Sequence, residues 1–244
     1  MLKILSLILF LYSPILVFSQ SLIGFGGGIN YSKAIPENPE YSEFYKSSYQ
    51  LGYGAGMIYD LSINQSFSVY SELKYSKRCK KIENNIEQHY SKAYFNYLEF
   101  PILIRLKQNY NGFTGYLNAG PQLGYWLGSK GSIYLFDNNY QAYNEKDFKL
   151  NFNSNSTEQE NYITEANRSQ LGLILGGGFL MQTNKISNLQ FDFRLVLGHT
   201  NFSNDLNEGI YSPDFIENYR SVFKSLEISV AYLLNIKELK RQLR

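Results

Sequence analysis

The feature that most constrains this chain is an alternation of apolar and polar residues that recurs along it. In "NLQFDFRLVLG", residues 188–198, large apolar residues occupy every second position and glutamine, aspartate and arginine lie between them. Successive side chains of a strand point to opposite faces, so such a stretch predicts a strand with one apolar face. The same alternation occurs in residues 22–32, 49–61, 65–76, 96–107, 112–128, 169–182 and 223–234. Eight strands are therefore expected.

The polar face of these strands is rich in glycine and in charges of both signs. A solvated exterior would carry many dispersed lysines and glutamates. A narrow lumen instead needs small residues to relieve crowding and charges that neutralise one another. We therefore expect the apolar face to meet lipid and the polar face to form a lumen charge network of Glu72, Lys74, Glu99, Arg105, Asp192, Arg194 and Glu227.

The connections between the strands alternate in length. Short turns surround "SINQ", "QNYNG" and "TNKIS", whereas residues 34–46, 78–92, 129–168 and 199–220 form long linkers. Tight periplasmic turns and long extracellular loops have this arrangement in outer-membrane barrels. The sequence predicts an all-β fold: an eight-stranded antiparallel up-and-down transmembrane β-barrel with short periplasmic turns and long extracellular loops.

The first residues have the pattern of a secretory leader. Lys3 precedes an apolar stretch that contains Pro14 and ends near Ser19, and no later run of about twenty apolar residues offers a membrane helix. We expect a signal peptide over residues 1–19, a barrel over 20–236 and a basic periplasmic tail over 237–244, with the mature protein in the cell outer membrane. The net charge of +2 is spread along the chain, which argues against nucleic acid as a partner.

Three segments resemble a known family. "NYLEFPILIRLK", residues 96–107, is similar to the Tyr-Leu-Glu-Ile-Pro signature of the small outer-membrane β-barrel proteins of Bacteroidota, often called PorT-like. "NAGPQLGYWLG" and "GLILGGGFLM" resemble that family's Gly-Pro-x-Leu-Gly strand and its glycine-rich strand, in the same order. The basic tail after Leu234 departs from the family's usual final aromatic residue. The resemblance implies an outer-membrane barrel, and one branch of the family is associated with type IX protein secretion.

Catalysis is not expected from these residues. His199 is followed by Thr200 and then Ser203, which is the wrong spacing for a His-x-Ser hydrolase motif, and His89 lies in a predicted loop. The single Cys79, taken as a loop thiol, and the isolated carboxylates show no metal-ligand spacing, so no metal or cofactor is predicted. An interior only wide enough for side chains also disfavours a conducting pore.

Function is therefore expected outside the lumen. The 129–168 loop is polar and contains the contact candidates Tyr134, Phe136, Tyr140, Tyr143 and Phe148. The leading hypothesis is binding of an extracellular ligand or protein through this loop, with outer-membrane lipid around the wall. The alternatives are an accessory component of a type IX-like secretion or outer-membrane assembly machine, acting through its proteins, and a soluble exported lipocalin-like binding barrel.

The charges of residues 96–107 also predict specific pairs. Glu99 and Arg105 are six residues apart, roughly 20 Å along a strand, so each needs a partner on a neighbouring strand. We expect Lys74 to pair with Glu99 and Glu72 to pair with Arg105. Pro101 has no amide donor, so a bulge or an unpaired position is expected there.

Overall fold

Eight long strands close into an antiparallel barrel in the computed structural model, which describes residues 21–37, 44–84, 89–136, 142–150, 152, 166–203, 209–212, 215–218 and 220–242. Each strand of the ring pairs with the next one along the chain, and the last pairs with the first. This is the up-and-down topology predicted from the alternation. The wall consists of β1 (Ser21–Pro36), β3 (Gln50–Ser62), β4 (Phe67–Asn84), β5 (Tyr90–Tyr110), β6 (Phe113–Phe136), β8 (Ser169–Gln182), β9 (Ser187–Gly198) and β12 (Ser221–Asn235).

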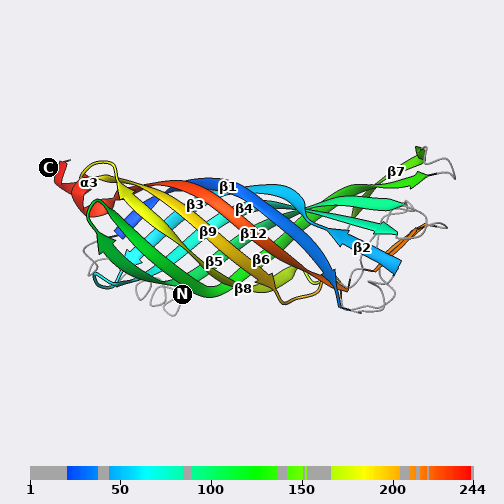
Figure 1. The fold of residues 1–244 in the computed structure, drawn as a ribbon, viewed down its shortest axis with the longest axis horizontal. Helices are drawn as coiled ribbons and strands as arrows, with labels where there is room; N and C mark the ends of the chain where they lie inside the picture. Colours follow the sequence, from blue (N-terminus) through cyan, green and yellow to red (C-terminus); the bar gives the residue numbers. More distant parts are fainter. Residues whose placement is uncertain are drawn as a thin grey trace, which may run out of the picture.

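Four short strands gather at one end of the barrel and a helix at the other (Figure 1). β2 pairs with β4, β7 with β6, and β10 with β11. The C-terminal α3 begins directly after β12, where the Asn235 side-chain oxygen accepts hydrogen bonds from two backbone amides of its first turn. These elements are β2 (Tyr45–Ser48), β7 (Ala142–Leu150), β10 (Gly209–Ser212), β11 (Phe215–Asn218) and α3 (Ile236–Gln242).

The turns at the α3 end are short and are closed by local chemistry. Asn64, after β3, accepts hydrogen bonds at 2.8 Å from the amides of Ser66 and Phe67, and Asn184 does the same in the turn after β8. Asparagine favours such turns because its side chain can replace a backbone acceptor. The turn between β5 and β6 uses Gly112 at φ 92°, a conformation that favours glycine. These turns fix the register of the hairpins.

The outer surface of the wall is apolar and the inner surface is polar. Ile104 and Leu117 are 63% and 67% exposed, whereas Arg105 and Asn118, their chain neighbours, are buried. Tyr31, which stacks on Tyr49 at 5.0 Å, is among the exposed rings at the outer end of this apolar band. This distribution suits a wall that faces lipid. Among the residues described, no helix has the length and apolar character needed to span a bilayer.

Two prolines interrupt the ladders without shifting the register. β4 has no registered partner for Pro101, and the β5–β6 pairing omits the positions facing Gly120 and Pro121, while residues on both sides keep the same alignment. The expected unpaired position at Pro101 is thus present on the β4 side only, because Pro101 faces Gln122 on β6. The bulge of β5–β6 lies elsewhere, between Asn96 and Tyr97.

The long connections are partly strand, which corrects the sequence prediction. β4 continues to Asn84, β5 begins at Tyr90, and β6 runs to Phe136 before β7 pairs back on it. Residues 78–84, 90–92, 129–136 and 142–150 are therefore strand, and we call them the outer extension. Cys79 accordingly lies buried on β4 and not in a loop. The reason is that the inward face, which is polar at the lipid level, becomes largely apolar beyond it and can bury a second core.

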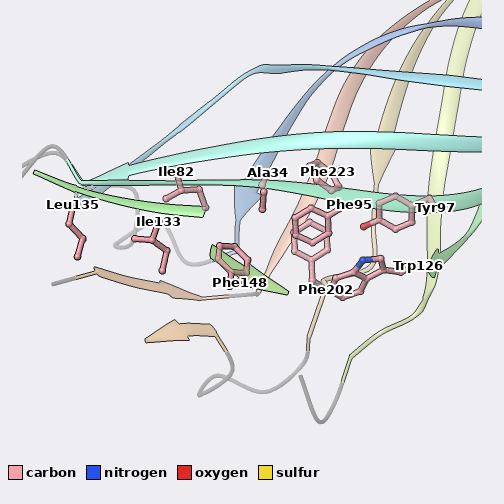
Figure 2. Packing of buried hydrophobic residues seen from close by; sticks show 11 residues of the cluster. Ala34, Ile82, Phe95, Tyr97, Trp126, Ile133, Leu135, Phe148, Phe202 and Phe223 are labelled. Atoms are coloured by element: carbon pink, nitrogen blue, oxygen red, sulfur yellow. The ribbon is translucent and has the colours of Figure 1, made fainter. Parts of the chain in front are cut away.

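That core fills the outer end of the barrel (Figure 2). Phe95 stacks on Trp126 at 5.2 Å and on Phe202 at 5.0 Å, and Phe223 meets Phe202 edge to face at 5.0 Å. We call this group the aromatic cap. Its buried members are Ala34, Ile82, Ala93, Phe95, Tyr97, Trp126, Ile133, Leu135, Phe148, Phe202 and Phe223.

Candidate functional site: the lumen charge network and the outer extension

All seven charged residues that the alternation assigns to the lumen point inward and are less than 9% exposed. They come from four strands of the wall, and they reach one another across the barrel because its interior is only a few side chains wide. The ion pairs form two groups, one toward the aromatic cap and one toward the short turns. The seven are Glu72 and Lys74 on β4, Glu99 and Arg105 on β5, Asp192 and Arg194 on β9, and Glu227 on β12.

The group nearer the cap contains two cations and two carboxylates. Lys74 Nζ lies 3.1 Å from Glu99 Oε2 and 2.8 Å from Glu227 Oε2. Arg78 Nη2 lies 2.7 Å from Glu99 Oε1 and 3.4 Å from Glu227 Oε1. Each charge therefore has two opposite neighbours. The Lys74–Glu99 pair is the one expected from the sequence, and the two residues are direct partners in the β4–β5 register.

The expected pairing of Arg105 with Glu72 is wrong. Arg105 Nη1 lies 2.7 Å from Asp60 Oδ2 and its Nη2 lies 3.4 Å from Asp192 Oδ2. In the β4–β5 register Arg105 faces Ser68, four residues from Glu72, which is about 13 Å along the strand. Glu72 instead pairs with Arg194 at 2.9 Å, across the lumen.

Tyrosine rings complete the group nearer the short turns. The Arg105 guanidinium lies 4.2 Å from the Tyr70 ring centroid and 3.8 Å from that of Tyr116. The Tyr116 hydroxyl donates to Asp192 Oδ2 at 2.8 Å, and the Tyr70 hydroxyl donates to Glu72 Oε2 at 3.1 Å. The guanidinium group is planar and can stack on both rings, whereas the ammonium group of a lysine could not.

Glycines make room for these side chains. A Cβ added at Gly178 would lie 2.6 Å from the Tyr116 hydroxyl, and one at Gly176 would lie 2.8 Å from Asn118 Oδ1. The lumen is therefore filled to contact. Small cavities of about 20 Å³ and 30 Å³ remain beside the ion pairs, room for about a water molecule each.

Three further members of the network were not singled out from the sequence. Asp60 on β3 and Lys107 on β5 were visible on polar faces, but they stand near strand ends, and Arg78 falls in a stretch assigned to a loop. With them, the ion pairs found among the described lumen residues join five cations to five carboxylates: Lys74, Arg78, Arg105, Lys107 and Arg194 with Asp60, Glu72, Glu99, Asp192 and Glu227. The network is neutral in formal charge.

The two histidines lie apart from this network. The Phe136 amide donates to His89 Nδ1 at 3.2 Å in the outer extension, and His199 is exposed just after β9. Within the described ranges, no group of three or more histidine, cysteine, aspartate or glutamate side chains could hold a metal ion. The lumen side chains are arranged to neutralise charge.

The aromatic contact candidates occupy different environments. Tyr134 and Phe136 lie on β6, half-buried, and both stack on Tyr90 of β5, at 4.6 Å and 5.8 Å. Phe148 lies on β7 but is buried in the aromatic cap, which excludes it from an exposed contact surface. Tyr143 is also on β7, with a side chain outside the described part, and Tyr140 lies outside the described residues.

A family model agrees with this architecture. The model of the outer membrane protein beta-barrel domain matches residues 18–204, more than half of the chain. The chain belongs to this family. As a member of it, the protein is assigned to the cell outer membrane, in agreement with the apolar outer wall.

Solved structures of outer-membrane proteins are similar to the chain at low sequence identity, and the first of them shares its fold. OprG of Pseudomonas aeruginosa is 10% identical, with a TM-score of 0.53 over 89% of this chain and 96% of that one. Ail of Yersinia pestis, in complex with the heparin analogue sucrose octasulfate, is 10% identical with a TM-score of 0.39, covering 88% and 99%. Neisserial surface protein A is 11% identical with a TM-score of 0.37, covering 86% and 95%. No curated protein matches the sequence.

Proposed function

We propose that this outer-membrane barrel is neither an enzyme nor a pore, and that it binds a partner at the cell surface through its outer extension. The observation that carries the proposal is the aromatic cap. It gives β5 and β6 a buried core beyond the lipid level and holds Tyr90, Tyr134 and Phe136 on the outside of the wall. Half-exposed aromatic clusters on a fixed support are typical of contact surfaces.

The proposed lack of conduction follows from the filled lumen. Ion pairs bridge β4, β5, β9 and β12 across the interior, and the aromatic cap closes the outer end above them. We expect no stepwise conductance when the purified protein is inserted into a planar lipid bilayer. Discrete channels of constant size would contradict this part of the proposal.

The binding role is tested by removing the outer aromatic side chains. Tyr134→Ala with Phe136→Ala is compared with Tyr110→Ala and Phe113→Ala, an exposed pair stacked at 5.1 Å at the opposite end of the barrel. Both variants are expected to show the heat-dependent gel shift of a folded barrel. When intact native cells are crosslinked, the bands that contain a bound partner should disappear for the Tyr134 and Phe136 variant and persist for the control variant. Unchanged bands with that variant would refute the role.

A secretion or assembly role is the second proposed function. The α3 end supports it, because the exposed side chains Lys237, Lys240 and Arg241 give the C-terminal helix a basic surface. This end is the periplasmic one if the short turns face the periplasm. The role predicts that deletion of the gene blocks export of other proteins and that α3 crosslinks to periplasmic partners. Normal export after deletion would exclude it.

We also propose that residues 1–19 are a signal peptide that is cleaved on export. Removal of residues 1–19 on export would leave Gln20 as the first residue, immediately before β1. N-terminal mass spectrometry of the protein from its native membrane tests this. We also propose that the protein is PorT-like, on the basis of the sequence segments around Glu99, Pro121 and Gly176. A defect in protein export after deletion of the gene would support this assignment.

A further inference from the structure

Five lysines lie on the outward face of four neighbouring strands, three of the wall and β7 beside them. They are Lys77 and Lys81 on β4, Lys92 on β5, Lys130 on β6 and Lys149 on β7. We call them the lysine patch. All are at least partly exposed, and the alternation places them on the face that is apolar further down the barrel.

The register sets these lysines against one another. Lys81 is the direct cross-strand partner of Lys92, and Lys130 is the direct partner of Lys149. Like charges directly opposite one another destabilise a sheet. The arrangement therefore favours an anion that bridges the ammonium groups.

Among the described side chains, carboxylates supply little of that charge. Glu83 lies 3.0 Å from Lys81 at the far edge of the patch, and Asp147 accepts a hydrogen bond from Ser132. In the part of the chain that is described, Lys77, Lys92 and Lys130 form no ion pair; Lys77 and Lys92 contact the central Tyr94 ring, at 4.2 Å and 5.8 Å. An aromatic ring between cations is suited to a sugar ring that carries anionic groups.

The level of the patch indicates which anion it meets. Lys77 lies two residues beyond Tyr75, an exposed ring at the outer end of the apolar band, or about 7 Å along the strand. Amphipathic rings favour the headgroup level of a bilayer. On the other side of the barrel Lys33 directly faces Lys224, two residues beyond Tyr31. The first outward-facing lysines on these strands therefore lie at the level of the lipid headgroups.

We propose that the lysine patch binds the phosphate groups of a phosphorylated glycolipid headgroup in the outer leaflet. Ammonium groups at this height attract anionic lipid, while their alkyl stems stay against the apolar wall. Tyr94 lies between them, placed to pack against the sugar that links the phosphates. Lys81 lies 4.3 Å from the Tyr90 ring, so the patch adjoins the aromatic group of Tyr90, Tyr134 and Phe136. The proposed lipid site uses other side chains and does not rest on the proposed partner binding.

Native mass spectrometry of the full-length mature protein in detergent tests the proposal. The probe is lipid A with two phosphates, compared with the same lipid after dephosphorylation and with inorganic phosphate as a competitor. The patch variant is K77Q/K92Q/K130Q. Its matched control is K185Q/K237Q/K240Q, which removes the same charge from exposed lysines near the short turns. K77R/K92R/K130R keeps the charge and reports any fault in folding.

The patch variant is expected to bind phosphorylated lipid A about tenfold or more weakly than the wild type. The control and the arginine variant should bind it as the wild type does, and dephosphorylated lipid should bind weakly to all. Equal binding by the patch and control variants would overturn the proposal, as would equal binding of the dephosphorylated lipid. Full competition by inorganic phosphate at the concentration of the lipid would show a free-anion site and overturn the lipid assignment.

Discussion

Substituting Glu99 by glutamine should destabilise the barrel strongly. Glu99 is 2% exposed and holds both Lys74, at 3.1 Å, and Arg78, at 2.7 Å. Glutamine has nearly the same volume, so the substitution removes charge and leaves packing almost unchanged. After it, the two cations share only Glu227.

The magnitude follows from these distances. Opposite charges about 3 Å apart attract by roughly 5 kcal/mol at an effective dielectric constant of about 20. Removing one member of a buried ion pair typically costs about 3–5 kcal/mol, because a buried charge is left uncompensated. We expect a loss of that size in the free energy of unfolding for Glu99→Gln.

Urea unfolding in detergent micelles measures the loss. Trp126 is the chain's single tryptophan and is buried beside Phe95, so its fluorescence reports opening of the barrel. Glu238→Gln, which breaks an exposed pair with Arg241, serves as the control and should cost less than about 1 kcal/mol. A loss for Glu99→Gln no larger than that of the control would refute the reasoning.

A double variant separates charge balance from other effects. Glu99→Gln with Lys74→Gln removes one charge of each sign and leaves Arg78 paired with Glu227. Its loss should be smaller than the sum of the two single losses by about 1–3 kcal/mol. Strict additivity would show that the network does not act as a unit.

Three further predictions concern the two faces of the wall. Gly28→Ala should prevent refolding, because the new Cβ would lie 2.1 Å from the Ile228 carbonyl oxygen. Gly27→Ala should refold normally, because its Cβ would lie 3.4 Å from its nearest neighbour, the Gly54 carbonyl oxygen. The heat-dependent gel shift distinguishes the two variants. Arg105→Lys should lower the free energy of unfolding by about 1–3 kcal/mol, through lost stacking and hydrogen bonds. Ile104→Arg should weaken insertion into lipid vesicles by about 2–4 kcal/mol, measured by urea titration.

Much of the fold was accessible from the sequence because the period of a strand is fixed by its backbone. Alternation assigned Leu98 and Glu99 to opposite faces without any knowledge of neighbouring strands, and the structure agrees. The alternation of short turns and long linkers predicted that the strands follow one another around an up-and-down barrel. The inward position of the seven lumen charges followed from the same rule.

The outer extension was not accessible in this way. In residues 129–136 the polar Lys130 and Ser132 interrupt the apolar outward face that marks a lipid-facing strand, so the segment was interpreted as loop, although β6 continues through it. Inward side chains such as Ile133 and Leu135 indicated a strand only once the buried cluster that they share with Ile82 and Phe148 was known. Phe148 was assigned to a contact surface for the same reason, because burial depends on what covers a side chain.

The sequence by itself determined the class of fold, the direction in which each strand side chain points, and the need for a lumen of balanced charge. Only the tertiary structure decided which charges meet. Arg105 pairs with Asp60 and Asp192, and Glu72 pairs with Arg194, because strand register and barrel closure set the distances across the lumen. A local pattern fixes the face of a side chain, whereas its partner depends on how distant strands align.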